Sequence, residues 1–209
     1  MKKQINYFER VVVLVIGVFI IAFGATLLVK SDIGGDSILV LQEGFTHLIG
    51  LDISKLGTGI LILNSFLIIV LFFMNKRMVN IGTFVISLLM GPLVTLYLKI
   101  PFLVTPDTFL FKFIVTITGI VISSLGVAIY IFANVGYSPY EGIILTIKDK
   151  FNLRFAYVKI AADIAMFSIG AILGGTFGVG SIMTIILFGP LIDIFGKLIN
   201  LKLTTEKPQ

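Results

Sequence analysis

One aspartate lies inside an apolar stretch of the chain, where a charged side chain is unusual. Asp163 belongs to the run 155–175, and the only other charged residue of that run is Lys159. Lys159 precedes Asp163 by four positions, so on a helix the two side chains share a face and can form an ion pair. A charge at such a depth in a membrane is costly unless it is paired or faces water, and it therefore indicates a functional site. The alternative is a structural ion pair near the membrane boundary, with Lys159 extending outward to water.

A polar residue and two prolines occupy inner positions in other apolar runs. Asn64 lies within 56–75, and Pro92 and Pro190 each lie more than ten residues after their runs begin. Proline removes a backbone donor and leaves carbonyl groups without helical partners. Those carbonyls, near Leu88 and Ile186, could bind a cation or a polar solute, although a simple packing kink is the alternative. We expect Asp163, Asn64 and the carbonyls near both prolines to line a solute path.

Two short segments, 35–50 and 137–152, follow apolar runs and carry further acidic and aromatic groups. They are too short to span a bilayer as helices. Either they lie flat at the membrane interface, or they are re-entrant and dip toward the bilayer centre, which requires that protein or water surround them. In both cases Glu43, Glu141 and Tyr140 are expected at the mouths of the path. The lone His47 completes no metal site, so no metal is expected.

The composition indicates a membrane protein. The 209 residues are 57% hydrophobic and 13% charged, against about 45–50% and 25% in soluble domains. Nucleic-acid binding is disfavoured despite the net charge of +5, because the basic residues lie between apolar runs. We predict an all-α polytopic fold in the lipid bilayer, with six transmembrane helices over the runs 11–29, 56–75, 78–98, 113–135, 155–175 and 179–196.

The basic residues predict the orientation of these helices. Six alternating spans place twelve of the sixteen Lys and Arg residues on one side. Cytoplasmic loops carry the excess of such residues. The sequence therefore predicts a multi-pass protein of the bacterial cytoplasmic membrane, with the N- and C-termini both cytoplasmic.

An internal repeat relates the two halves of the chain. GTFVISLLMGP (82–92) recurs as GSIMTIILFGP (180–190), and Gly17, Gly24 and Gly34 are each followed 102 positions later by a glycine. We predict a single membrane domain, 1–209, with repeat one at 10–100 and repeat two at 111–200. Three spans per repeat invert the second copy, as in many secondary transporters. The alignment of the short segments stays open: Glu141 pairs with Leu39 without a gap, or with Glu43 if a gap falls earlier.

The chain resembles the YczE/YyaS/YitT-type family of bacterial integral membrane proteins. The resemblance rests on IGGDSILVLQEGFTHLIG, GYSPYEGIIL, Asn64 in LILNSFLIIV and the two glycine-proline cassettes. It implies a polytopic bacterial membrane protein and leaves its activity open.

Two functions fit these observations. The first is a transporter or permease-like protein that moves a small polar or ionic solute by alternating access at the repeat interface. The second is a non-transporting membrane partner, such as a substrate-capture subunit or a scaffold for a cytoplasmic enzyme. An enzyme is not expected, because nucleophile, metalloprotease and nucleotide-loop motifs are missing, and no cofactor is expected. Whether the chain forms a homodimer or binds another protein stays open.

Overall fold

Apolar helices make up most of the chain. The computed structural model describes residues 6–101, 103 and 105–203, and within them every regular element is a helix. The eight α-helices of this part are α1 (Tyr7–Ser31), α2 (Ser37–Leu48), α3 (Leu56–Asn75), α4 (Ile81–Leu98), α5 (Phe109–Ala133), α6 (Pro139–Phe151), α7 (Phe155–Ile172) and α8 (Val179–Leu203). Two 3-10 turns, η1 (Ile53–Lys55) and η2 (Lys76–Met78), flank α3. The predicted all-α class is confirmed for these residues.

Five of the described helices are long and apolar enough to cross a membrane. They are α1, α3 with its flanking turns, α4, α5 and the Val179–Ile199 part of α8. α3 has the predicted bounds, and α8 begins at the predicted residue. The remaining predicted run forms α7, an 18-residue helix that carries Lys159 and Asp163 and is not among the five.

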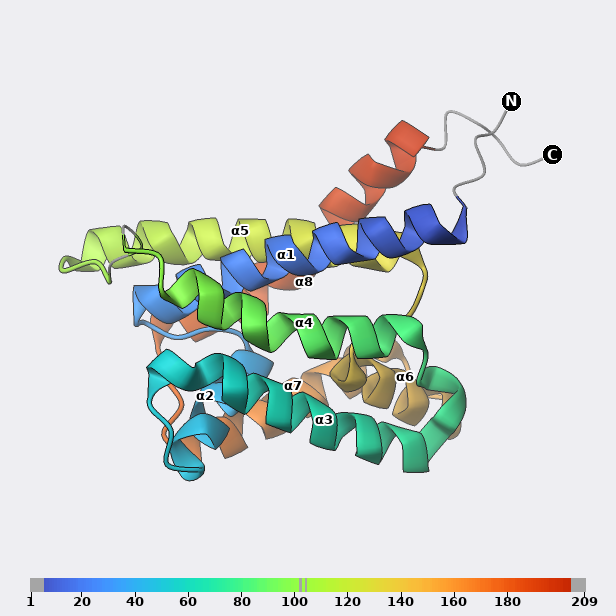
Figure 1. Ribbon diagram of the computed structural model, residues 1–209, viewed down its shortest axis with the longest axis horizontal. Coiled ribbons are helices and arrows are strands. Elements are labelled where there is room, and N and C mark those ends of the chain that lie inside the picture. Colours follow the sequence, from blue (N-terminus) through green and yellow to red (C-terminus); the bar gives the residue numbers. More distant parts are fainter. Residues whose placement is uncertain (1–5, 102, 104, 204–209) are drawn as a thin grey trace.

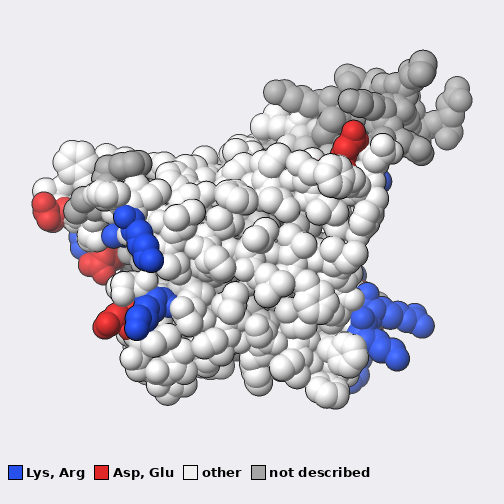
Figure 2. All heavy atoms as spheres, in the orientation of Figure 1, with Lys and Arg blue, Asp and Glu red and all other residues white. Residues whose placement is uncertain are grey.

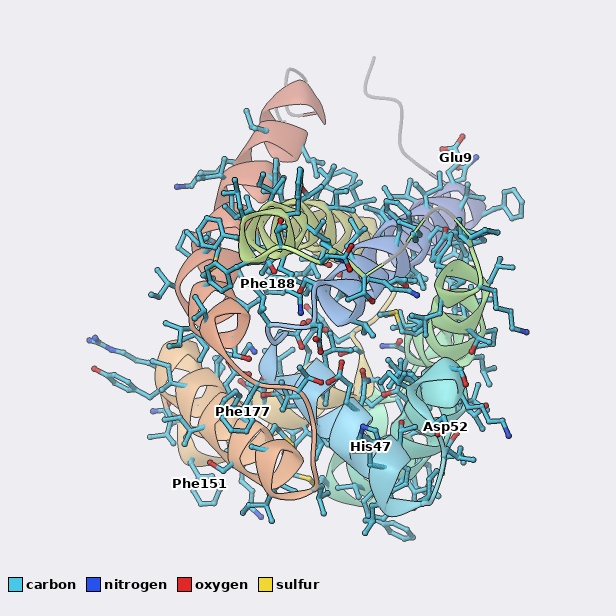
Figure 3. All side chains as sticks on the ribbon, turned by 90° about the vertical axis from the view of Figure 1, so that its left-hand side faces the viewer. Glu9, His47, Asp52, Phe151, Phe177 and Phe188 are labelled. Atoms are coloured by element: carbon cyan, nitrogen blue, oxygen red, sulfur yellow. The ribbon has the colours of Figure 1, made fainter. Side chains whose placement is uncertain are left out.

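The helices lie in two layers, which Figures 1 and 3 show from perpendicular directions. α1 and α5 lie side by side in one layer, with α4 packed on α1 and α8 packed on α5. The other layer contains α3, α7 and the two short helices. Both α2 and α6 contact α3 and α7, so the short helices lie between these two longer ones. α4 joins the layers because it also packs on α3.

α1 and α5 approach each other closely at four glycines. A Cβ atom on Gly17 would lie 2.9 Å from the carbonyl oxygen of Gly126, and one on Gly126 would lie 2.8 Å from that of Gly17. Gly24 and Gly119 meet in the same reciprocal way, at 2.9 and 3.0 Å. Small residues of this kind let helix backbones pack directly against each other in membranes. Gly119 and Gly126 follow Gly17 and Gly24 by 102 positions. The same offset therefore relates one glycine contact to the other.

The turns that lead into the short helices are built alike. α1 and α5 both end at a residue in the left-handed region, Asp32 (φ 54°) and Asn134 (φ 49°). Asp36 and Ser138 then cap the N-termini of α2 and α6 with their side chains. Each pair of positions is 102 residues apart, so no gap falls between α1 and the start of α2 when the halves are aligned.

Both short helices are partly buried among the longer ones, α2 more than α6. Eight of the twelve residues of α2 are buried, as are five of the thirteen in α6. The buried residues of α2 include polar ones, among them Ser37, Gln42 and Glu43. Their polar side chains therefore face neighbouring helices, where other side chains can bind them.

On the face that Figure 2 shows, charged side chains gather at the two ends of the long helices and leave an uncharged band between them. At the end where α3 turns into α4, the turn η2 carries Lys76 and Arg77. The opposite end carries both signs and includes an ion pair of 2.9 Å between Lys112 and Asp32. Such a band is typical of a protein surface that faces lipid.

The packing differs between the two halves at the last helix. Gly91 of α4 lies against the backbone of Gly57 in α3. The corresponding glycine of α8, Gly189, has no atom within 4 Å of a Cβ placed on it, and α7 and α8 form no comparable contact among the described residues. Within the most apolar stretch of each of the helices α1, α3, α4 and α5, 39–50% of the residues are buried. The same fraction is 6% in α8. α8 therefore packs on the remaining helices mainly through α5.

Candidate functional site

The carboxylate of Asp163 is bound by side chains from three helices. Its Oδ1 atom accepts hydrogen bonds from Ser37 Oγ at 2.5 Å and from Tyr140 Oη at 2.6 Å. Lys159 Nζ lies 2.6 Å from Oδ1 and 2.8 Å from Oδ2, which confirms the predicted ion pair. The exposed fractions of the two side chains are 35% for Lys159 and 24% for Asp163. We call Ser37, Tyr140, Lys159 and Asp163 the polar cluster.

The short helices place two members of the polar cluster at their first turns. Ser37 is the first residue of α2 and Tyr140 is the second residue of α6. Because both side chains bind Asp163, the N-terminal ends of α2 and α6 come together beside α7. A helix N-terminus carries a partial positive charge, and two such ends lie beside the Asp163 carboxylate.

A second carboxylate lies next to the polar cluster. Asp36 precedes Ser37 and accepts a hydrogen bond of 2.8 Å from the backbone N–H of Leu39. Burial raises the pKa of Asp36 above its ordinary value, and the backbone bond and the charge of Lys159 act in the opposite direction. The site thus contains two carboxyl groups and one ammonium group.

The ammonium group of Lys159 also faces an aromatic ring. Its Nζ atom lies 5.1 Å from the centroid of the Tyr140 ring. This distance is within the range of a cation–π interaction. Tyr140 therefore contributes both its hydroxyl, to Asp163, and its ring face, to Lys159.

The two predicted glutamates have separate partners. Glu43 is buried on α2, and its Oε2 atom accepts a hydrogen bond of 2.8 Å from the backbone N–H of Thr176, in the turn between α7 and α8. Glu141 accepts one from the hydroxyl of Tyr130 on α5. The N-cap residues of α2 and α6, Asp36 and Ser138, lie 102 positions apart, and at this offset Glu141 pairs with Leu39 rather than with Glu43.

The remaining predicted residues are not joined to the polar cluster. Asn64 is buried on α3 and forms no side-chain hydrogen bond with any described residue. Pro92 and Pro190 lie within α4 and α8, which continue as helices past them, and both prolines are exposed. His47 lies at the exposed end of α2, which faces the viewer in Figure 3. The contribution of Asn64 and the prolines to a solute path stays a prediction.

Ser37 was not predicted from the sequence as a partner of Asp163. Asp36 and Ser37 after two glycines are a typical N-terminal cap, and this signal identifies a helix start without identifying what the helix start touches. The bonds from Thr176 to Glu43 and from Tyr130 to Glu141 were missed for the same reason, because each depends on the packing of helices.

The polar cluster offers hydrogen-bond donors, carboxylate acceptors and an aromatic face within a few ångströms. No group of three or more His, Asp or Glu side chains among the described residues could hold a metal ion. Two hollows on the surface, one lined by Arg10 and Asn134 and one by residues of the α4–α5 loop, include no residue of the polar cluster. The arrangement is therefore suited to binding a small polar or charged group through its side chains.

Apolar helices that surround a charged pair define a helical membrane protein with an internal polar site. The chain belongs to the DUF6198 family, a family of unknown function, whose model matches residues 8–197. It is 24% identical over 193 residues to an uncharacterized protein of Haemophilus influenzae, covering 92% of this chain and 85% of that protein. It is 23% identical over 190 residues to the uncharacterized protein YyaS of Bacillus subtilis, covering 88% and 91%. This relative confirms the resemblance to a YyaS-type family, and no solved structure matches the chain.

Proposed function

We propose that the protein is a small transporter of the bacterial cytoplasmic membrane that moves a small polar or ionic solute by alternating access. One observation carries the proposal: the first turns of α2 and α6 meet at Asp163, between apolar helices. Many secondary transporters bind their solute where the ends of short helices converge at the interface of two inverted repeats. In this proposal the polar cluster is the solute site, and the protein catalyses no covalent reaction.

The reciprocal glycine contacts support an inverted repeat. With an offset of 102 residues as far as the start of the short helices and of 98 at the glycine-proline cassettes, α1 corresponds to α5, α2 to α6, α3 to α7 and α4 to α8. The contact of Gly17 with Gly126 then becomes the contact of Gly119 with Gly24, which is the exchange that a two-fold axis produces. Contacts of α4 with α1 and of α8 with α5 correspond in the same way.

The proposal requires α7 as a sixth span. Its 18 residues give a length of about 27 Å, close to the thickness of the hydrocarbon core. Its charged residues, Lys159 and Asp163, bind each other within the polar cluster, which lowers the cost of placing them in a membrane. With six spans, the end rich in basic residues at η2 faces the cytoplasm together with both termini.

The burial of α2 and α6 supports the re-entrant alternative over the flat one. A helix that lies flat at the interface exposes its polar face to water, whereas Ser37 and Glu43 of α2 are buried against other helices. Non-helical backbone at membrane depth is tolerated when protein surrounds it. The first turns of α2 and α6 would then lie inside the bilayer.

Solute flux in proteoliposomes tests the proposal. Solutes that raise the thermal stability of the purified protein are loaded for counterflow, and the Asp163→Asn and Asn64→Ala variants are compared with the unmodified chain. We expect Asp163→Asn to lower the initial rate about tenfold or more, the effect of losing roughly 1.4 kcal/mol of binding or transition-state stabilisation. We expect a smaller loss for Asn64→Ala.

Asp193→Asn is the matched control, because it makes the same change at an exposed position of α8. It should leave the rate unchanged. The transporter proposal fails if folded Asp163→Asn carries solute at the unmodified rate. It also fails if the protein comes out of mild detergent in a stoichiometric complex and shows no flux, the behaviour of a membrane partner or scaffold.

A further inference from the structure

The polar cluster binds a cation that belongs to the chain itself. The Lys159 ammonium contacts both carboxylate oxygens of Asp163, at 2.6 and 2.8 Å, and lies 5.1 Å from the centre of the Tyr140 ring. A carboxylate and an aromatic face are the two kinds of group that proteins use to recognise organic ammonium ions. The cluster therefore contains an ammonium site that is occupied by a side chain.

Lys159 can leave this site without a change in the fold. It belongs to α7, the same helix as Asp163, and lies four residues after the start of that helix. Its flexible four-carbon stem allows the ammonium group to reach toward the membrane surface near the helix start. The two side chains are 35% and 24% exposed, so the ion pair is only partly buried, and screening by water weakens it.

The groups that remain would still be arranged for a cation. Ser37 and Tyr140 continue to orient the Asp163 carboxylate through hydrogen bonds that do not involve Lys159. Asp36 interacts electrostatically with both Lys159 and Asp163, so a second carboxyl group lies near the vacated ammonium position. The partial charges of the two helix ends offset part of this negative charge. One positive charge restores the balance, which favours a monovalent ligand.

The ring of Tyr140 distinguishes an organic ammonium ion from a metal ion. Mg²⁺ and Ca²⁺ require shells of about six to eight oxygen ligands, and the described residues contain no such group of side chains. An alkylammonium ion is less strongly hydrated and gains from an aromatic face.

We propose that the polar cluster binds a small monovalent organic ammonium ion, which replaces the Lys159 ammonium on Asp163 and on the ring face of Tyr140. The inference rests on the proposed function in one respect: it assigns the solute class of the same site. Lys159 acts in this scheme as an internal competitor that occupies the site when the solute is absent.

Calorimetric titration of the full-length protein in detergent tests the proposal. The probes are tetramethylammonium and ethylammonium chloride, with sodium chloride and tert-butanol as ionic and neutral controls. We expect saturable binding of one or both ammonium ions and none of the controls. Lys159→Met should tighten binding about threefold or more, because it removes the partly exposed ammonium group that competes for Asp163. Lys197→Met, which changes an exposed lysine of α8, should have no effect.

Further variants separate the two recognition groups. Asp163→Asn should abolish binding. Tyr140→Leu should weaken it about threefold or more, whereas Tyr140→Phe, which keeps the ring, should weaken it less. The proposal is overturned if folded Lys159→Met binds no more tightly than the unmodified chain, or if no ammonium probe binds either protein.

A measurement on the unmodified chain covers the case in which Lys159→Met does not fold. Reductive methylation labels free lysine amines, and mass spectrometry reports the rate at Lys159. Saturating tetramethylammonium should raise that rate about twofold or more, since an ion pair of this kind hides the amine about half the time or longer. Equal rates with tetramethylammonium and with sodium would contradict displacement.

The outcome separates this inference from the transporter proposal. Ammonium binding without flux of any probe would refute the transporter and leave the binding site. Asp163-dependent flux of another solute, with which ammonium ions do not compete, would refute the ammonium site and leave the transporter.

Discussion

The Ser37 hydroxyl donates a hydrogen bond of 2.5 Å to Oδ1 of Asp163, although the two residues lie 126 positions apart in the chain. The bond joins the first turn of α2 to the middle of α7, and so joins the first half of the chain to the second. Tyr140 binds the same oxygen from α6. Asp163 is thus the point at which both short helices are tied to a long one.

Removing the Ser37 hydroxyl should measure the strength of this connection. Hydrogen bonds to charged groups contribute about 1.5–3 kcal/mol to stability, so we expect Ser37→Ala to lower the free energy of unfolding by about that amount. Thermal unfolding in detergent, followed by size-exclusion chromatography, is the measurement. Ser65→Ala is the control, because the Ser65 hydroxyl is exposed and bonds only to a carbonyl of its own helix. Equal losses in the two variants would contradict the assignment.

The close crossing of α1 and α5 predicts that a methyl group added at their contact destabilises the protein. In Gly126→Ala, the added Cβ would lie 2.7 Å from the backbone nitrogen of Ile21 and 2.8 Å from the carbonyl oxygen of Gly17. Backbone cannot yield as a side chain does, so we expect a loss of about 1–3 kcal/mol from overpacking. Gly189→Ala should be neutral or slightly stabilising, since that position is open and alanine favours a helix. A larger loss at Gly189 would show that α8 packs against something else.

Burial of Glu43 predicts a change of stability with pH. Desolvation raises the pKa of Glu43 from 4.5 to about 7. The folded protein therefore holds this proton more tightly than the unfolded chain does. Its contribution to stability is complete below about pH 4.5 and is lost as the pH rises toward 7.

Glu43→Gln should remove this dependence and should raise stability at pH 8 by roughly 3 kcal/mol relative to the unmodified chain. The amide oxygen of glutamine can still accept the hydrogen bond from Thr176. Melting temperatures between pH 4 and pH 8 report the difference. If the Glu43→Gln curve parallels that of the unmodified chain, the carboxyl is ionised at neutral pH.

The absence of cysteine from the chain makes its topology accessible to labelling. Phe151, at the end of α6, and Phe177, after α7, are both exposed. If α7 crosses the membrane, cysteines introduced at these two positions should react with a membrane-impermeant maleimide from opposite sides. In intact cells we expect labelling of Phe177→Cys and protection of Phe151→Cys. Labelling of both from one side would exclude α7 as a span.

The long helices could be predicted from the sequence because lipid imposes a simple rule on them. An apolar run of about 20 residues is long enough to cross the membrane as a helix, and the predicted run at α3 matches the observed helix residue for residue. The Lys159–Asp163 pair was equally accessible, because a spacing of four residues places two side chains together on any helix.

The arrangement of the short helices could not be predicted in the same way. The composition of α2 fits a helix at the interface as well as one inside the protein, and only its contacts with α3 and α7 distinguish the two. The hydrogen bonds that Ser37 and Tyr140 donate to Asp163 depend on that placement, and they follow from no spacing in the chain. The sequence likewise predicts two equivalent last helices, whereas α8 lacks the contact that α4 makes with α3.

Lys159 and Asp163 belong to one helix, and this has a consequence for timing. Their separation requires only rotation about side-chain bonds, which takes picoseconds to nanoseconds for exposed groups, whereas motion of helix bundles takes microseconds to milliseconds. Opening of the ion pair is therefore complete long before any large movement begins. The binding equilibrium of a ligand at Asp163 can be measured on a protein whose helices do not move.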